Sequence, residues 1–182
     1  MPIIGLCGHK GSGKDTVANI LMDTDNYVQL AFANFLKNSL KQLFNWDDSN
    51  FSADNKEKVD PYWNVTPRKM CQDLGTEFLR IHCKNLLSSD FKLPNGENYK
   101  STFHIKRMNQ EVLKLIENNS DVNIVFSDVR FQDELNYIKK LGGIIIKIVR
   151  PDNSFNEFSK HISEEGIDEL KNVDYEIVND RT

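Results

Sequence analysis

The sequence predicts an α/β fold, with a central parallel sheet of about five strands and helices on both faces. Short apolar runs alternate along the chain with amphipathic segments of helical spacing. The apolar runs are nearly continuous, which is typical of strands buried on both faces of a parallel sheet. The 182 residues, of which 39% are hydrophobic and 27% charged, suit one globular domain with a sizeable core.

The beginning of the chain predicts strand, helix, strand and helix in turn. Ile3–Cys7 is a short apolar run that ends at Gly8, as a buried strand does, and we expect a helix over 15–22. A second strand is expected over 27–32. Asn34 is suited to cap the next helix. The apolar residues of that helix recur at helical spacing, at Leu36, Leu40, Leu43 and Phe44.

The middle of the chain predicts a loop, one long helix and an excursion. Residues 45–64 are polar and acidic without a clear period, so we expect a loop. Thr66-Pro67 is typical of a helix N-cap followed by its first residue, and the helix should run to about Cys83. Residues 84–101 contain the turn signal Pro94-Asn95-Gly96 and form the excursion.

The last part returns to alternating helices and strands. Helices are expected over 103–118 and 131–141, and Gly142-Gly143 ends the second of them. The apolar segments between and after these helices predict strands over 122–127, 144–149 and 174–179.

Composition excludes several classes of protein. A net charge of −4 argues against a broad surface for a nucleic-acid polymer. No apolar run approaches the roughly 20 residues that cross a membrane. The N-terminal residues lack a basic region, so we expect no signal peptide. Three cysteines without metal-ligand spacing are typical of reduced thiols. We therefore expect a cytoplasmic protein, in the host cytoplasm if the chain is viral.

The strongest motif is Gly8-His9-Lys10-Gly11-Ser12-Gly13-Lys14, which fits G-x-x-x-x-G-K between a strand and a helix. Glycines let the backbone wrap a phosphate with its N–H groups inward, the helix N-terminus adds positive potential, and Lys14 reaches the outer phosphates. Asp15 stands where Ser or Thr is common, with Thr16 one place later. The alternative is a glycine-rich turn without a ligand, in which Asp15 is a carboxylate favoured in a first helical turn.

Asp128 lies near the carboxyl end of the strand expected over 122–127, on the sheet edge where ligands bind. Val129 and Arg130 follow it, where a water-splitting ATPase usually has Glu. An arginine here suits phosphate recognition or charge stabilisation during phosphoryl transfer. The alternative for Asp128 and Arg130 is an ordinary loop ion pair.

The helix that begins at Pro67 carries two stripes. The predicted core stripe is Met70, Leu74, Phe78 and Ile81. The opposite stripe is Arg68, Gln72, Gly75 and Thr76, with Arg80 one turn further on. A glycine in mid-helix costs about 1 kcal/mol relative to alanine, so something should approach the backbone closely there. A base or sugar and tight helix packing are both open, and Arg80 could also be a solvated surface residue.

These motifs together resemble those of phage-type deoxynucleoside monophosphate kinases. The matching segments are Gly8 to Thr16, Phe32 to Lys37, Arg68 to Glu77, Ser127 to Arg130, Gly142-Gly143, Val149 to Pro151 and His161 to Glu164. The resemblance implies a three-layer P-loop NTPase fold of the nucleoside-monophosphate-kinase kind. It also implies one kinase domain over 1–182, with a helical substrate-binding part about 34–118 and a short lid about 150–164.

The resemblance further implies transfer of the γ-phosphoryl group of ATP to a deoxynucleoside monophosphate, with Mg²⁺. It places Gly11, Ser12, Gly13, Lys14, Asp15, Thr16 and Arg150 on ATP. It assigns the metal to Thr16 and Asp128, and catalysis to Lys14, Lys10, Arg130 and Arg68. The acceptor residues are Lys10, Leu36, Lys37, Arg68, Gln72, Gly75, Thr76, Arg80, Asp128, Arg130 and Gln132. Arg150 and His161 bracket the lid.

Two alternatives stay open at this point. A phosphomevalonate-kinase-like enzyme of the animal type would share the Gly-Lys-Asp loop and an Asp-x-Arg-like segment. A non-catalytic ATP-binding accessory protein would bind ATP without acceptor-dependent ADP release. The expected partners are small-molecule substrates, neither a nucleic-acid polymer nor a membrane, and a homodimer is left open. The accepted bases are not determined by residue types alone.

Overall fold

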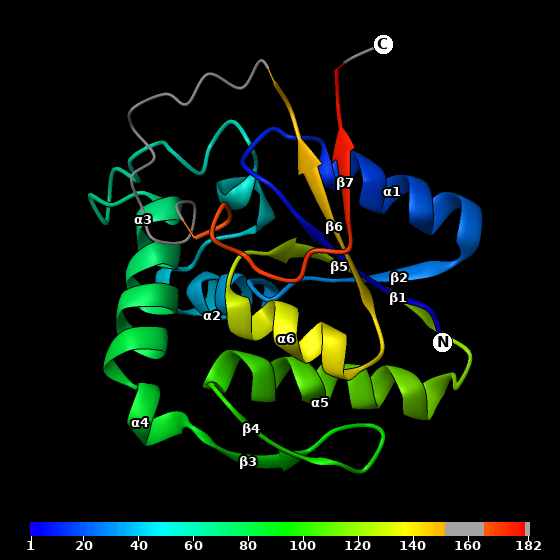
Figure 1. Ribbon diagram of the computed structural model, residues 1–182. Coiled ribbons are helices and arrows are strands. Elements are labelled where there is room, and N and C mark those ends of the chain that lie inside the picture. The colour runs from blue at the N-terminus through cyan, green and yellow to red at the C-terminus, as the bar shows by residue number, and fades with distance from the viewer. Residues whose placement is uncertain (152–165, 181–182) are drawn as a thin grey trace. The chain divides into compact units, whose positions relative to one another are not determined.

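The computed structural model describes residues 1–151 and 166–180 (Figure 1). The chain forms two compact units, a sheet unit of Met1–Phe32 and Asp90–Thr182 and a helical unit of Ala33–Ser89. The helix expected over 103–118 belongs to the sheet unit, and the substrate-binding part expected at about 34–118 stays a prediction. The lid expected at 150–164, with His161, lies outside the described residues beyond Pro151.

The sheet unit contains a five-stranded sheet in which every pairing is parallel, as predicted. The strand order is β2-β5-β1-β6-β7. The strands are β1 (Ile3–Cys7), β2 (Tyr27–Leu30), β5 (Asn123–Val129), β6 (Ile144–Val149) and β7 (Tyr175–Val178). Because parallel strands end at the same edge, the residues that follow β1, β5, β6 and β7 share one edge of the sheet.

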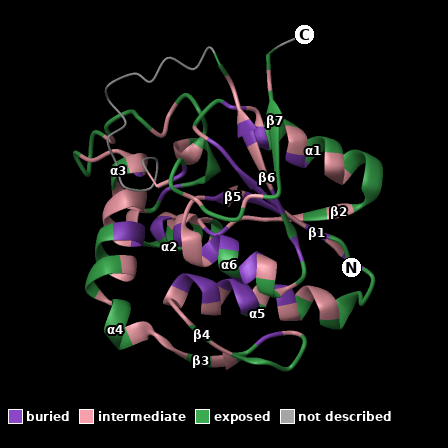
Figure 2. Ribbon diagram, viewed as in Figure 1, coloured by how far each residue is buried: buried purple, intermediate pink, exposed green. Residues whose placement is uncertain are grey.

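Alternating side chains of these strands build a core on each face of the sheet. Ile3 and Cys7 of β1 pack with α5 (Phe103–Asn118) and α6 (Gln132–Lys140). Leu6 packs on the other face with Ala18 of α1 (Lys14–Asp25). Figure 1 shows α5 and α6 together on one side of the sheet and α1 on the other, and Figure 2 shows the central strands largely buried. The prediction of helices on both faces is confirmed.

The excursion after the helical unit is a two-stranded sheet of β3 (Ser89–Lys92) and β4 (Asn98–Ser101). The predicted turn at Pro94-Asn95-Gly96 joins the strands, and Gly96 has a φ of 85°. Leu93 is buried in the same core as α5 and α6, which anchors the hairpin to the sheet unit. No helix in the described part of the chain has the length and apolarity needed to cross a bilayer.

The helical unit has its own apolar core around Leu36, Leu40 and Trp46. Its elements are α2 (Asn34–Phe44), the 3₁₀ turn η1 (Asp48–Phe51), α3 (Pro67–Gln72), the π-helix η2 (Asp73–His82) and α4 (Lys84–Leu87). Thr66 is the predicted cap, since its Oγ1 accepts the Lys69 N–H at 3.1 Å. The prediction that Asn34 caps α2 is wrong, because Asn34 is already helical and Ala33 precedes the helix.

The long helix predicted from Pro67 changes winding at Asp73, where η2 begins. A π-helix bonds residue i to i+5 and so has more residues per turn than an α-helix, which rotates later side chains away from the expected stripe. Phe78 and Ile81, expected in the core, are 52% and 47% exposed. Gly75 and Thr76, expected on the opposite stripe, are buried instead.

Candidate nucleotide-binding site

The phosphate loop joins β1 to α1 through three glycines with positive φ. The angles are 147° at Gly8, 78° at Gly11 and 107° at Gly13, which side-chain-bearing residues rarely adopt. A Cβ on Gly8 would also lie 2.4 Å from the carbonyl oxygen of Ile148. The glycine spacing found in the sequence is therefore required by the shape of the loop.

Lys14 is the first residue of α1 and is only 7% exposed. Its Nζ donates to the carbonyl of His9 at 3.3 Å, and the Ser12 N–H donates to the same carbonyl at 3.1 Å. The ammonium group is thus folded back over the loop. A cationic group at the end of a glycine loop and the start of a helix suits a phosphate ligand.

The N-terminus of α1 adds further anion-binding groups. Gly13 is the N-cap of this helix and, as a glycine, offers no side chain to cap the first turn. The N–H groups of a first turn have no partners within the helix and carry positive potential. Ser12 is 1% exposed, and its Oγ has no hydrogen-bond partner in the part of the chain that the structure describes. A bound phosphate oxygen would satisfy all of these groups.

The remaining predicted loop residues are open to solvent. Lys10, Gly11, Asp15 and Thr16 are all exposed, and Asp15 and Thr16 stand in the first turn of α1. Among the residues described, no cluster of three or more His, Cys, Asp or Glu side chains is arranged for a metal ion. The loop therefore presents a hydroxyl and a carboxylate near its phosphate-binding end without a preformed metal cage.

Asp128 lies near the end of β5, beside the start of the phosphate loop, since Val129 pairs with Cys7. Its Oδ1 accepts the Phe32 N–H at 2.7 Å, which fixes the carboxylate. Arg130 follows, and its backbone N–H donates to Glu134 Oε2 at 2.8 Å. Glu134 is 2% exposed, and sequence reasoning missed it. Its position three residues after the N-cap of α6 was the available signal.

The ends of β6 and β7 also reach the phosphate loop. Arg150 Nη1 donates to the Gly11 carbonyl at 3.0 Å, and Asn179 Nδ2 donates to the Ser12 carbonyl at 2.9 Å. Arg150 was expected on ATP, and the structure brings it to the loop that would hold ATP. Asn179 was not expected, because only the pairing of β7 with β6 brings it there.

A second contact ties the C-terminal part of the chain to the loop. Asp168 accepts hydrogen bonds from His9 Nε2 and Lys147 Nζ, each at 2.9 Å. Burial tends to raise the pKa of Asp168, but the hydrogen bonds from Lys147 and His9 outweigh it and lower this pKa. A histidine inside the glycine loop is thereby paired with an ionised carboxylate.

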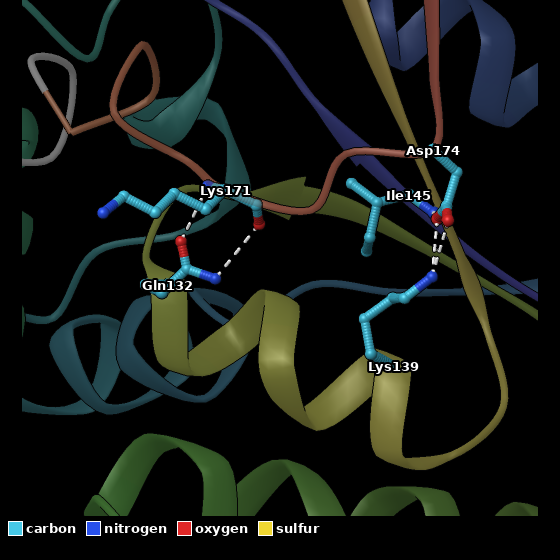
Figure 3. Close-up of polar contacts among 5 residues, drawn as sticks. All are labelled: Gln132, Lys139, Ile145, Lys171 and Asp174. Carbon is cyan, nitrogen blue, oxygen red and sulfur yellow. Dashed lines mark hydrogen bonds and ion pairs between the residues drawn. The ribbon is translucent and has the colours of Figure 1, made fainter.

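Gln132 has a different environment from the one we expected. Its Oε1 accepts the Lys171 N–H at 2.9 Å, and its Nε2 donates to the Lys171 carbonyl at 3.2 Å (Figure 3). The same Nε2 also donates to Asn136 Oδ1 at 2.9 Å. The same view shows Asp174, whose Oδ1 accepts a hydrogen bond from Lys139 Nζ at 2.6 Å and whose Oδ2 accepts one from the Ile145 N–H at 2.7 Å. The hydrogen bonds of Gln132 therefore connect α6 to the segment before β7. The contact of Gln132 with a substrate stays a prediction.

The helical unit holds the other predicted acceptor residues. Arg68 Nε donates to Glu57 Oε1 at 2.5 Å, and its backbone N–H donates to the Lys56 carbonyl at 2.9 Å. Lys37, Gln72 and Arg80 are half-buried, and Leu36 and Thr76 are buried.

The structure accounts for the mid-helix glycine. A Cβ on Gly75 would lie 2.6 Å from Leu36 Cδ2. Of the two explanations left open for this residue, tight helix packing is the one that the structure supplies.

The fold and the site define the P-loop class of nucleotide-binding proteins: a strand, a glycine loop, a buried lysine at a helix start and a carboxylate near the end of the adjacent strand. Residues 95–182 match the family model for deoxynucleotide monophosphate kinase. A protein of Acanthamoeba polyphaga mimivirus, named as a candidate deoxynucleotide monophosphate kinase, is 37% identical over 185 residues, covering 100% of this chain and 90% of that protein. The chain belongs to the deoxynucleotide monophosphate kinase family, which confirms the resemblance.

Proposed function

We propose that this protein transfers the γ-phosphoryl group of ATP to a deoxynucleoside monophosphate. The observation that carries the proposal is the glycine loop with the buried Lys14 at its end, in a member of a kinase family. A kinase of this family uses a nucleoside triphosphate and a small nucleotide acceptor. Both are anions, and the proposed residues are mostly cationic or hydrogen-bond donors.

The donor half of the site is the phosphate loop. The amides of the loop and of the first turn of α1 surround the phosphates of ATP, and Ser12 Oγ completes the set of donors. Lys14 would exchange its bond to the His9 carbonyl for the outer phosphates. Because the loop amides are already fixed before binding, they stabilise charge without reorganising, and Lys14 alone changes its partner.

The metal assignment follows from the same groups. Mg²⁺ usually binds through one or two carboxylates together with substrate phosphates rather than in an all-protein cage. Thr16 and Asp128 supply a hydroxyl and a carboxylate of that kind, so the residues fit a Mg²⁺ ion that arrives with ATP. When bound, such an ion would neutralise charge on the β- and γ-phosphates.

The phosphate-binding part of the acceptor half is assigned to cationic side chains, and residues of several other types complete the acceptor half. Arg68 would hold the acceptor phosphate, because its guanidinium is a forked donor whose Nε is held in place by Glu57. Lys10 and Arg130 would neutralise charge between the two phosphates. The remaining acceptor residues are Leu36, Lys37, Gln72, Gly75, Thr76, Arg80, Asp128 and Gln132.

The proposed reaction is in-line phosphoryl transfer from ATP to the acceptor phosphate. Such a transition state needs positioning and charge neutralisation more than covalent help from the protein. Lys14 and the loop amides hold the donor, Arg68 orients the acceptor, and Lys10 with Arg130 stabilises the charge that develops between them. No side chain has to form a bond to phosphorus.

An ADP-release assay with each of the four deoxynucleoside monophosphates tests this function. Lys14→Ala and Arg130→Ala should each lose most acceptor-dependent turnover. Arg107→Ala is the matched control, because Arg107 pairs with Glu111 along α5, and it should keep wild-type turnover. Near-wild-type turnover in both site variants would contradict the assignment.

A wider panel separates the alternatives. Ribonucleoside monophosphates and phosphomevalonate are tested beside the deoxynucleotides. Preferred turnover of phosphomevalonate would favour the other small-molecule kinase. Tight ATP binding without acceptor-dependent ADP release would favour a non-catalytic accessory protein.

A further inference from the structure

The strands β6 and β7 end side by side, and both ends reach the phosphate loop (Figure 1). The Asn179 N–H donates to the Val149 carbonyl at 2.7 Å, directly after the last pair of the two strands. This bond fixes the backbone of Asn179 beside that of Arg150. Arg150 and Asn179 therefore stand side by side at the end of a rigid sheet, although they are not neighbours in the sequence.

The side chains of Arg150 and Asn179 donate hydrogen bonds to two consecutive carbonyls of the loop. Arg150 donates to the carbonyl of Gly11 at 3.0 Å and Asn179 to that of Ser12 at 2.9 Å. A strand end is a more rigid support than a loop, so these bonds constrain the peptide groups on either side of Ser12.

The bond to Ser12 determines where the next amide points. The Ser12–Gly13 peptide is trans, since the described chain has no cis bond. In a trans peptide the C=O and N–H groups point in opposite directions. Holding the Ser12 carbonyl against Asn179 therefore turns the Gly13 N–H away from Asn179, to the other side of the loop backbone.

We propose that Asn179 is a positioning residue for ATP: it holds the Ser12 carbonyl outward so that the Gly13 N–H is aimed at the donor phosphates. This inference rests on the proposed function, because it needs a phosphate group in the loop. Asn179 itself does not touch the reacting atoms.

The side chain of Asn179 suits the place beside Gly13 both in its size and in being neutral. A Cβ on Gly13 would lie 2.8 Å from Asn179 Nδ2, so a side chain there would displace the carboxamide from its present position. An aspartate of the same shape would bring a negative oxygen against the Ser12 carbonyl and add repulsion toward the phosphates. A neutral donor is the side chain that suits this place.

The test compares Asn179→Leu with Asn123→Leu. Asn123 is a matched control, because its Nδ2 also donates to a backbone carbonyl, that of Asp25 at 2.9 Å, at the opposite edge of the same sheet. The dissociation constant of ATP is measured by calorimetry without acceptor, and the unfolding temperature by scanning calorimetry. Asn179→Leu should weaken ATP binding about three- to tenfold, the worth of one net hydrogen bond. Asn123→Leu should lower the unfolding temperature similarly and leave ATP binding unchanged.

Asn179→Asp provides a second measurement if Asn179→Leu fails to fold. Its loss of ATP affinity relative to wild type should shrink as the pH falls from about 6 to about 4, toward the ordinary aspartate pKa of about 3.9, because a protonated carboxyl regains the donor. Asn123→Asp, measured in parallel, should show no such trend. Wild-type ATP affinity in the Asn179 variants, or an equal loss in the Asn123 variants, would overturn the inference. A wild-type protein that binds ATP without phosphorylating any acceptor would contradict the proposed function alone.

Discussion

The phosphate loop and the helix that begins at Pro67 are both candidate binding elements, and they are built in opposite ways. In the loop the groups offered to a ligand are mostly backbone amides. Arg150 and Asn179 fix that backbone through its carbonyls, and Asp168 holds the His9 side chain. On the helix the offered groups are long side chains such as Arg68, fixed through Nε by Glu57. The comparison teaches how the proposed function divides its two ligands: a rigid backbone would bind the phosphates of ATP, and long side chains would bind the acceptor.

The largest effect is expected when the cation of the phosphate loop is removed. Lys14→Met should lower kcat/KM by about 10² to 10³, the usual effect of losing one preorganised charge-stabilising donor. The unfolding temperature without nucleotide should not fall, because a buried ammonium carries a desolvation cost that methionine lacks. ADP release and calorimetry measure the two effects. Retained activity would show that the loop does not act on the transferred phosphoryl group.

The variant Arg68→Ala tests whether the helix that begins at Pro67 binds the acceptor. Losing a hydrogen bond from a charged donor costs about 2 kcal/mol. This cost should lower kcat/KM for the deoxynucleotide about thirtyfold. The dissociation constant of ATP should stay unchanged, because the loop amides bind ATP. Arg68→Lys should recover only part of the loss, since lysine lacks the fork. An effect on ATP affinity alone would reverse the assignment of the two regions.

The packing of the helix is tested at Gly75. Gly75→Leu should lower the free energy of unfolding by about 1–3 kcal/mol, since the larger side chain collides with Leu36. Gly75→Ala should change it by less than about 1 kcal/mol, because displacement of the Leu36 methyl is offset by the better helix propensity of alanine. Denaturant unfolding measures both. Equal stability of the leucine variant would mean that a ligand, not packing, requires the glycine.

The smallest effect concerns the segment that leads into β7. The hydrogen bond from Lys139 and then that from the Ile145 N–H lower the pKa of Asp174 below its ordinary value of 3.8. A lowered carboxyl pKa contributes stability above that ordinary value and loses it as the pH falls through the folded-state pKa. Asp174→Asn should therefore cost up to about 1 kcal/mol at pH 7 and much less near pH 3. Asp121→Asn, on an exposed turn, is the control, and a pH-independent loss at Asp174 would refute the ionic cause.

The sequence by itself determined the features that depend on neighbours along the chain. Alternating apolar runs and helical spacing determined the parallel sheet and its helices, and three glycines with Lys14 determined the phosphate loop. These signals are local, because strand burial, positive φ and a helix start each depend on a few consecutive residues. The same local rule misplaced Phe78 and Ile81, since a change from α to π winding leaves no clear mark in residue order.

Only the tertiary structure decided which distant groups support the loop. Asn179 lies 167 residues from Ser12 and Arg150 lies 139 residues from Gly11, and each reaches its carbonyl because β7 pairs with β6 and β6 with β1. Gln132 bonds the backbone of Lys171, a contact that residue order does not reveal, and its expected contact with a substrate stays a prediction. A side-chain amide or guanidinium bonds whatever donor or acceptor the fold places within about 3 Å, and strand order, not residue type, sets that neighbour.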